Sequence, residues 1–247
     1  MPEHRVLGFV GARTGSKGLP GKNIKNFHGK PLIQWTLECL QGSELLTDVV
    51  VSTDGEDIAK VCREAGAWVP FLRPPELATD EANICDVILY TLDRLRKEEG
   101  RNYTHVMLAH PTVPLRQSWH IDEAVSKYFK DMNSPTETLV SGKPIPSKYG
   151  WMMHRTEEGY MDFSLGDIET MPLQRQAFID RFLPNGALWI FPVKDFKGDL
   201  YRTNTQLYIM DDIYSVDIDT MEDFNLAWKN FEELTALKTP PRSQKDL

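Results

Sequence analysis

The sequence predicts an α/β fold in which helices cover both faces of a mostly parallel sheet. Short, continuously apolar runs rich in β-branched residues are typical of strands buried on both faces. Helical patterns alternate with these runs over the first half of the chain, and this succession favours parallel strands. The length of 247 residues suits one sizeable domain with an appendage, or two small domains.

The first predicted strand, Val6 to Val10, leads into a glycine-rich loop that ends at Asn23. The loop has glycines at positions 11, 15, 18 and 21, together with the cations Arg13, Lys17 and Lys22. Glycine lets backbone N–H groups approach an anion closely and the cations neutralise that anion, so the loop is a candidate phosphate site. The signatures G-x-x-x-x-G-K-[ST] and G-x-G-x-x-G are both absent, and a solvated turn is the alternative for the loop taken alone.

The following elements continue the alternation. The patterns predict helices from Lys30 to Leu40, from Glu56 to Ala65 and from Asn83 to Glu99, and strands from Asp48 to Thr53, from Trp68 to Leu72 and from Thr104 to Ala109. Ligands of such sheets collect beyond the carboxyl ends of the strands. We therefore expect four loops to meet at one edge, namely residues 13–23, 53–55, 73–80 and 110–116.

The alternation breaks between residues 141 and 184, a segment rich in proline, tryptophan, methionine and tyrosine. Within it, Ser147 to Met153 has the mixed polarity of an exposed strand. The chain returns through a tight Asn185-Gly186 turn to a strand ending at Phe191, and Glu222 to Leu234 predicts a closing helix. We expect an α/β domain over residues 1–140 and 185–237, an excursion over 141–184, and a disordered polar tail over 238–247.

Two carboxylates alternate near the end of the chain, Asp217 and Asp219, in the segment Tyr214 to Thr220. Side chains two positions apart in an extended chain point to the same side. Two carboxylates on one side suit Mg²⁺ or Mn²⁺, which take carboxylate oxygens together with water and phosphate oxygens. A solvated strand end or a helix cap is the alternative for so short a pattern.

The composition argues against several classes of protein. A net charge of -8 argues against a nucleic-acid binder. Cys39, Cys62 and Cys85 are widely spaced in apolar patterns, so we expect buried thiols in a reducing compartment and neither a disulfide framework nor a zinc site. The sequence has no charged-then-apolar N-terminal signal and no run of eighteen apolar residues, so we expect a cytoplasmic protein without a membrane segment.

The glycine-rich loop, R-T-G-S-K-G-L-P-G-K-N followed by G-K-P-L-I-Q-W-T-L-E, resembles the signature of the cytidylyltransferases that make CMP-sialic acid and related CMP-nonulosonic acids. The segments S-T-D-G, R-P-P-E-L-A-T-D, P-T-V-P-L-R, N-G-A and S-V-D-I-D-T-x-x-D-F continue the resemblance, which runs from Leu7 to Phe224. His110 departs from it, because the family usually has glutamine there. A neutral imidazole still offers one donor and one acceptor, and a strand-end residue satisfied by the backbone is the alternative for His110.

This resemblance implies a Rossmann-like nucleotidyltransferase fold and transfer of CMP from CTP to an acid sugar, with release of pyrophosphate. It implies nucleotide contacts from Ala12, Arg13, Gly15, Ser16, Lys22, Asn23, Arg73 and Asp80. It implies a catalytic set in which Arg13, Lys17 and Lys22 neutralise the triphosphate while Asp217 and Asp219 hold the Mg²⁺ or Mn²⁺ ion. It implies sugar contacts from His110, Pro111, Thr112, Arg116, Lys148, Arg175, Gln176 and Asn185, with Lys143 as the alternative to Lys148.

The excursion of the resembled family forms a dimerisation domain that reaches over the partner's active site, so we expect a homodimer with shared sites. The expected partners are CTP and an acid sugar, without nucleic acid or membrane. Two rival classes stay open: a sugar nucleotidyltransferase that uses UTP or GTP, and a non-catalytic relative that binds a sugar or a partner. The S-K-G-L-P-G-K-N segment argues against the first, whose loop would usually contain G-x-G-T-R. No side chain in the sequence stands out as the general base.

Overall fold

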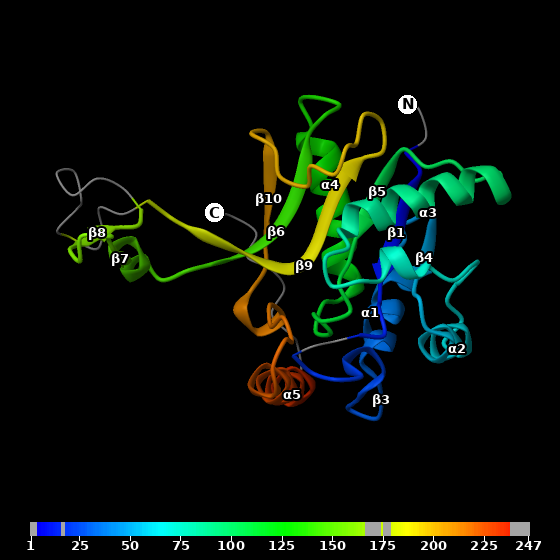
Figure 1. The fold of residues 1–247 in the computed structure, drawn as a ribbon, viewed down its shortest axis with the longest axis horizontal. Helices are drawn as coiled ribbons and strands as arrows, with labels where there is room; N and C mark the ends of the chain where they lie inside the picture. Colours follow the sequence, from blue (N-terminus) through cyan, green and yellow to red (C-terminus); the bar gives the residue numbers. More distant parts are fainter. Residues whose placement is uncertain (1–3, 16–17, 166–173, 175–178, 238–247) are drawn as a thin grey trace.

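The computed structural model describes residues 4–15, 18–165, 174 and 179–237. A six-stranded sheet in the order β10-β6-β9-β5-β1-β4 forms its centre (Figure 1). The strands are β1 (Val6–Gly11), β4 (Asp48–Ser52), β5 (His105–Leu108), β6 (Thr138–Pro144), β9 (Phe182–Pro192) and β10 (Thr205–Ile209). Neighbouring strands are parallel except where β9 pairs with β5 and β6. The prediction of a mostly parallel sheet is confirmed.

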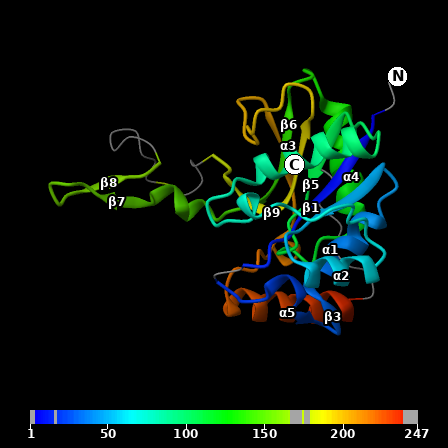
Figure 2. The same cartoon turned by 45° about the vertical axis from the view of Figure 1, so that its right-hand side comes forward.

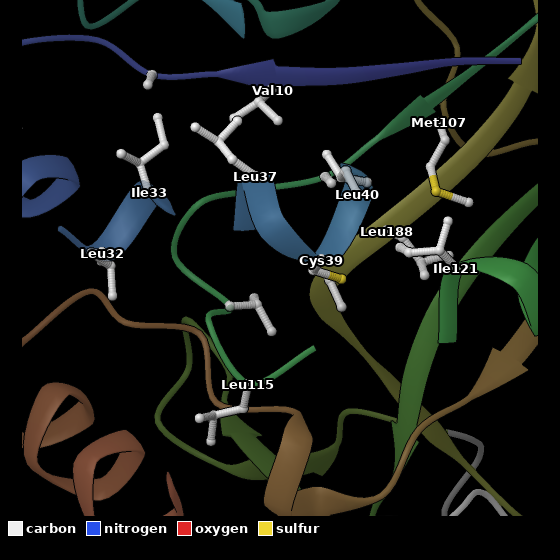
Figure 3. Packing of buried hydrophobic residues seen from close by; sticks show 14 of the residues in the cluster. Val10, Leu32, Ile33, Leu37, Cys39, Leu40, Met107, Leu115, Ile121 and Leu188 are labelled. Carbon is white, nitrogen blue, oxygen red and sulfur yellow. The ribbon is translucent and has the colours of Figure 1, made fainter. Parts of the chain in front are cut away.

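Helices cover both faces of this sheet, as predicted (Figure 2). They are α1 (Leu32–Gln41), α2 (Glu56–Glu64), α3 (Ile84–Glu98), α4 (Ser118–Asp131) and α5 (Met221–Ala236). Buried side chains of α1, α2, α4 and α5 belong to one hydrophobic cluster, whereas those of α3 belong to a second cluster across the sheet. Figure 3 shows the first cluster, where Leu37 and Leu40 of α1 lie near Val10 of β1 and Met107 of β5.

The sequence of β1 is apolar throughout because both faces of this strand are covered. Val6 and Val10 belong to the first cluster, and Leu7 and Phe9 belong to the second. Side chains of a strand alternate between faces, so a strand covered on both faces needs apolar residues at successive positions. The inner position of β1, between β5 and the edge strand β4, is therefore consistent with its composition, and the loop after it emerges between these two strands at the carboxyl edge.

Helix α5 closes the fold by packing on a small hairpin formed by β2 (Asn26–Phe27) and β3 (Lys30–Pro31) (Figures 1 and 2). The Phe27 ring makes edge-to-face contacts with the rings of Phe224 and Trp228, at centroid distances of 5.5 and 5.7 Å. Such aromatic pairs contribute beyond their buried area. Because α5 directly follows Asp219 and the hairpin directly follows the glycine-rich loop, this packing holds the two segments side by side.

The strand predicted from Trp68 to Leu72 is absent. Only Trp68 forms a bridge, to Val50 of β4. Pro70 has no N–H group to continue a ladder, and the chain then turns so that Arg73 N donates to Thr53 O at 2.7 Å. A 3₁₀ turn, η2 (Pro75–Leu77), follows.

Strands β6 and β9 continue beyond the sheet into an arm, which we define as residues 145–181 (Figure 1). The described part of the arm contains a 3₁₀ helix, η3 (Ser147–Trp151), and a hairpin of β7 (Met153–Arg155) and β8 (Met161–Phe163). The prediction of a strand from Ser147 to Met153 was therefore wrong for most of its length. Tyr149 N donates to Pro146 O at 3.0 Å, and this turn replaces a ladder. The predicted tail, residues 238–247, lies outside the described residues.

The tight turn predicted at Asn185-Gly186 is a β-bulge inside β9. Strand β9 runs through both residues, and its register with β6 shifts between Val140 and Gly142. Gly186 has φ +70°, a conformation that glycine adopts without strain. The Asn-Gly pair thus marks a change of direction in a continuous strand.

The three cysteines are buried and unpaired, as expected. Within the described residues, no helix combines the length and the apolar character needed to cross a membrane.

Candidate functional site

Two neighbouring cavities lie beyond the carboxyl end of β1, where the predicted loops meet. The first, of about 290 Å³, is termed the lysine chamber and is lined by Gly11, Arg13, Gly18, Lys22, Asn23, His110, Pro111, Thr112 and Asp219. The second, of about 240 Å³, is termed the arginine chamber and is lined by Gly11, Arg13, Arg73, Leu77, Thr79, Asp80, Ala82, Ile84, Val87 and His110. Gly11, Arg13 and His110 line both chambers and form their junction, so the chambers are adjacent, and the two together are termed the groove.

The glycine-rich loop is held in place by bonds to its neighbours. Ala12 N donates to Ser52 O at 3.0 Å, and Thr14 N donates to Asp54 Oδ1 at 3.0 Å. The buried Asn23 amide donates to Arg13 O at 3.0 Å. These bonds fix the course of the backbone on both sides of Arg13, so Arg13 reaches the groove from an ordered support.

Lys22 connects the loop to the acidic segment near the end of the chain. Its Nζ donates to Ile218 O at 2.6 Å and to Asp219 Oδ1 at 2.9 Å. The Lys22 side chain is 11% exposed, whereas that of Asp219 is 76% exposed. Gly18 packs against the same segment, because a Cβ built there would lie 2.5 Å from Asp219 O. A cation, an exposed carboxylate and a glycine-rich backbone therefore meet at the lysine chamber.

Asp217 lies deeper than Asp219. Burial raises the pKa of the Asp217 carboxyl, and the charge of Asp219 raises it further, while a hydrogen bond from Thr112 and the charge of Lys22 lower it. Ile218 N donates to Thr112 O at 2.9 Å and ties the acidic segment to the loop after β5. The two carboxylates thus lie close enough for the charge of Asp219 to act on Asp217, although the segment forms no strand.

Asp223, which the sequence analysis did not single out, orders this segment. Its Oδ2 accepts hydrogen bonds from Asp219 N at 3.1 Å and from Thr220 N at 2.8 Å. It forms a capping box with Thr220 at the start of α5. The T-x-x-D spacing is a recognised start signal for a helix and could have revealed this residue.

The arginine chamber is built around a guanidinium with a fixed orientation. Arg73 is 6% exposed, and it donates from Nε to Ser52 Oγ at 3.3 Å, from Nη2 to Ser52 O at 2.6 Å and from Nη1 to Leu77 O at 3.3 Å. Within the described residues these bonds use three of its five N–H donors, leaving one on each terminal nitrogen. Arg13 and Asp80 form an ion pair of 2.6 Å at the same chamber. The chamber therefore offers a rigid planar donor beside a half-exposed ion pair.

His110 stands at the junction as an uncharged group. Burial lowers its pKa to about 4, with further contributions from the charges of Arg116 and Lys22. Its ring packs edge-to-face on Trp189 at a centroid distance of 5.1 Å. Near neutral pH His110 thus presents one donor and one acceptor.

Comparison with known proteins identifies the family. A sequence model of a family described as cytidylyltransferase matches residues 7–147. The chain belongs to the cytidylyltransferase family. The CMP-N,N'-diacetyllegionaminic acid synthase of Legionella pneumophila is 33% identical over 236 residues, which cover 92% of this chain and 97% of that protein. The pseudaminic acid cytidylyltransferase of Campylobacter jejuni is 26% identical, covering 90% and 94%.

Other members of the cytidylyltransferase family are longer. The N-acylneuraminate cytidylyltransferase of Streptococcus agalactiae is 32% identical over 87% of this chain, and the chain spans about half (51%) of its length. Among solved structures, a CMP:2-keto-3-deoxy-manno-octonic acid synthetase complexed with CTP superimposes with a TM-score of 0.67 at 11% identity, covering 93% of this chain and 99% of that chain. This likeness concerns the fold, and it agrees with the predicted nucleotidyltransferase architecture.

Two of the residues predicted to contact the sugar, Arg116 and Asn185, instead use their polar atoms in hydrogen bonds within this cytidylyltransferase-family chain. Arg116 is 2% exposed and donates from Nη1 to Ala187 O and from Nη2 to Thr36 Oγ1 and His110 O. Asn185 is 4% exposed and its amide is shared among neighbouring residues of β6, β9 and the acidic segment. Neither side chain lines a chamber of the groove, and both stabilise the protein around it.

Lys143 at the end of β6 and Lys148 in the arm line neither chamber of the groove. Lys143 pairs with Asp212 at 3.3 Å, beside a separate apolar cavity at the root of the arm. Lys148 is exposed and its Nζ lies 5.7 Å from the centroid of the Tyr149 ring. Gly15 is exposed in the loop, with nothing within 4 Å of a Cβ built on it. Ser16, Lys17, Arg175 and Gln176 lie outside the described residues.

Proposed function

We propose that this chain transfers CMP from CTP to the anomeric hydroxyl of a nonulosonic-type acid sugar and releases pyrophosphate. The observation that carries the proposal is the lysine chamber, where Arg13, Lys22 and Asp219 converge beyond the carboxyl end of β1. Relatives named for neuraminate, legionaminic acid and pseudaminic acid support the choice of sugar class.

In the proposed reaction, the sugar oxygen attacks the α-phosphorus while the bond from that phosphorus to the pyrophosphate oxygen breaks and one proton is released. Negative charge builds up on the phosphoryl oxygens and on the departing pyrophosphate. Arg13, Lys22 and the loop N–H groups are suited to neutralise it, and Lys17 is proposed to assist. The bonds that already anchor Asn23 and Lys22 mean that little reorganisation is required at the moment of transfer.

Asp217 and Asp219 are proposed to hold Mg²⁺ or Mn²⁺. Their fit is supported by the surroundings of Asp217, whose pKa is raised first by burial and then by the charges of Asp219 and Asp223, while Thr112 and Lys22 lower it; a bound cation would offset the repulsion between these carboxylates. Hard carboxylate oxygens are the ligands that these ions prefer. When bound, the ion would supply neutralisation of phosphate charge. Lys22 pairs with one oxygen of Asp219 and would share that carboxylate with the ion.

The arginine chamber is proposed to bind cytosine. Arg73 keeps one N–H on each terminal nitrogen, and these two donors are proposed to bond the adjacent N3 and O2 acceptors of cytosine. Uracil has an N–H at N3, so its entry would leave one donor facing another. Ala12, Asn23 and Asp80 are proposed to complete the nucleotide site.

The acid sugar is proposed to lie at the junction of the chambers, beside His110, Pro111 and Thr112. The carboxylate of the sugar requires a cation nearby, and we propose that a second copy of the chain supplies Arg175, Gln176 and either Lys143 of β6 or Lys148 of the arm. The exposed apolar residues of the arm support a dimer interface there. These residues include Tyr160 (74% exposed), Met161 (66%) and Ile179 (74%), and Leu183 of β9, next to the arm, is 52% exposed.

A pyrophosphate-release assay tests the reaction. Each of the four nucleoside triphosphates is combined with each acid sugar named for the relatives, with Mg²⁺, with Mn²⁺ and with a chelator. We expect turnover with CTP and one acid sugar, abolished by the chelator. Equal turnover with UTP or GTP would leave only a sugar nucleotidyltransferase, and binding of a sugar without any turnover would favour a non-catalytic relative.

Light scattering and complementation test the shared site. A monomer at micromolar concentration would contradict the homodimer. Mixed Lys22→Met and Arg175→Ala chains should recover activity that neither variant has alone, because a mixed dimer contains one site with both native residues. Absence of recovery in a verified mixed dimer would show that Arg175 acts within its own subunit.

A further inference from the structure

The carboxylate of Asp217 lies directly against a glycine. A Cβ built at Gly186 would collide with Asp217 Oδ2 and would lie 3.0 Å from Asp217 Cγ. Its next neighbour would be Val113 Cγ2 at 3.6 Å, an ordinary contact. The Thr112 side chain hydrogen-bonds the same carboxylate. The absence of a side chain at Gly186 thus creates the space that Asp217 occupies.

The bulge that contains Gly186 also holds the backbone leading to Asp217. Asn185 Oδ1 accepts from Ser141 Oγ at 2.6 Å, and Asn185 Nδ2 donates to Ser215 Oγ at 2.8 Å. Ser215 lies two residues before Asp217 and is 3% exposed. Strands β6 and β9 therefore fix both the carboxylate of Asp217 and the chain that carries it.

The contact at Gly186 is separate from its backbone conformation. Other glycines also have positive φ without crowding a neighbour. Gly66 has φ +75°, close to the +70° of Gly186, and the nearest atom to a Cβ built there is 4.0 Å away. A positive φ alone explains why glycine is favoured at both positions, but only Gly186 is packed against a carboxylate.

We propose that Gly186 is a positioning residue for Asp217, and that through it strands β6 and β9 determine where this carboxylate lies relative to the lysine chamber. The inference rests on the proposed function in one respect, since the role of Asp217 in transfer is part of that function. The contact itself does not depend on the reaction. The proposal is therefore tested in two separate ways.

Thermal unfolding of a double-mutant cycle tests the contact. Gly186→Ala and the matched control Gly66→Ala are each made in the natural chain and in an Asp217→Ala background. The control should lower Tm by about 2 to 8 °C in both backgrounds, the cost of one alanine with positive φ. Gly186→Ala should lower Tm at least twice as much in the natural chain, but no more than the control in the Asp217→Ala background.

The outcomes of this cycle are distinct. A Gly186→Ala chain that fails to fold, but folds once Asp217 is replaced, supports the contact. An equal loss of Tm in both backgrounds, or failure to fold in both, would overturn the proposal, because the cost would not then depend on the carboxylate.

Kinetics test the consequence for the reaction. A displacement of Asp217 by about 1 Å should lower kcat about 100-fold in Gly186→Ala. The KM for CTP should change less than about twofold, because Gly186 lines neither chamber. The milder Ser215→Ala variant should lower kcat about tenfold, and Gly66→Ala should leave both constants unchanged. An unchanged kcat in Gly186→Ala would overturn the proposal. If the natural chain itself releases no pyrophosphate, the proposed function fails, and the unfolding cycle still decides the contact.

Discussion

Replacement of Lys22 by methionine should lower catalytic activity far more than it lowers stability. Methionine keeps an unbranched apolar stem and removes the charge and the donors of Nζ. The variant loses the ion pair with Asp219 and the hydrogen bond to Ile218 O. Because Lys22 lines the lysine chamber and is only 11% exposed, it also removes a charge from the place where phosphate charge is proposed to develop.

The two effects differ in size. Asp219 is 76% exposed, so solvent screens the ion pair and its loss costs about 0.2–1 kcal/mol. The hydrogen bond to Ile218 O adds about 0.5–1.5 kcal/mol. Together they should lower Tm by about 1–10 °C for a domain of this size. Loss of a preorganised group that stabilises developing charge should lower kcat about 100- to 1,000-fold.

The assay measures pyrophosphate release and thermal unfolding on the same preparations. Lys25→Met is the matched control, because Lys25 belongs to the same short segment but lines neither chamber. Its Nζ instead lies 5.7 Å from the centroid of the Phe224 ring. The control should keep kcat within about twofold. A Lys22→Met variant with natural turnover would refute the role of Lys22, and equal activity losses in both lysine variants would show a general disturbance of the loop.

Three further predictions follow from the same groove. CTP should be preferred over UTP by at least about tenfold in kcat/KM, and Arg73→Ala should weaken CTP binding and narrow this preference; unchanged CTP affinity would remove Arg73 from base recognition. Asp219→Asn should keep the circular dichroism spectrum and lose most turnover, so natural activity at limiting Mg²⁺ would exclude Asp219 as a metal ligand. Burial lowers the pKa of His110 to about 4, so between pH 6.5 and pH 4 the unfolded chain binds a proton there that the folded chain does not. Stability should therefore fall as the pH falls through this window, and His110→Gln should reduce the fall by about 1 kcal/mol per pH unit in denaturant titrations; an identical pH dependence in the variant would contradict the neutral imidazole.

Much of the fold could be predicted from local sequence because strands and helices depend on residues close together in the chain. The apolar run of β1 indicates a strand covered on both faces, and the spacing of apolar residues in α3 indicates a helix with one buried face. The alternation of these patterns predicts parallel strands, and parallel strands bring their following loops to one edge. Arg13, Lys22, Arg73 and His110 were brought together by this rule alone.

Predictions from local patterns were wrong in two situations. One is a strand that forms only if a distant strand pairs with it, and the other is a typical turn sequence that lies inside a strand. Pro70 stops the strand predicted after Trp68, and the turn through Tyr149 takes the place of a predicted strand in the arm. Asn185-Gly186 has the composition of a tight turn, yet the register between β6 and β9 makes it a bulge. A glycine with positive φ suits both a tight turn and a bulge, and only the strand that pairs with it distinguishes the two.

The sequence by itself determined which residue types lie near the groove, and the tertiary structure decided which of them have donors left for a ligand. Arg116 satisfies Ala187 O, 71 positions away, and Asn185 satisfies Ser141, 44 positions away, so both support the site without lining it. Lys22 meets Asp219 across 197 positions, where α5 packs on the hairpin after the loop. A buried polar group must be paired, and whether its partner is the protein or a ligand depends on atoms far along the chain that only folding brings within reach.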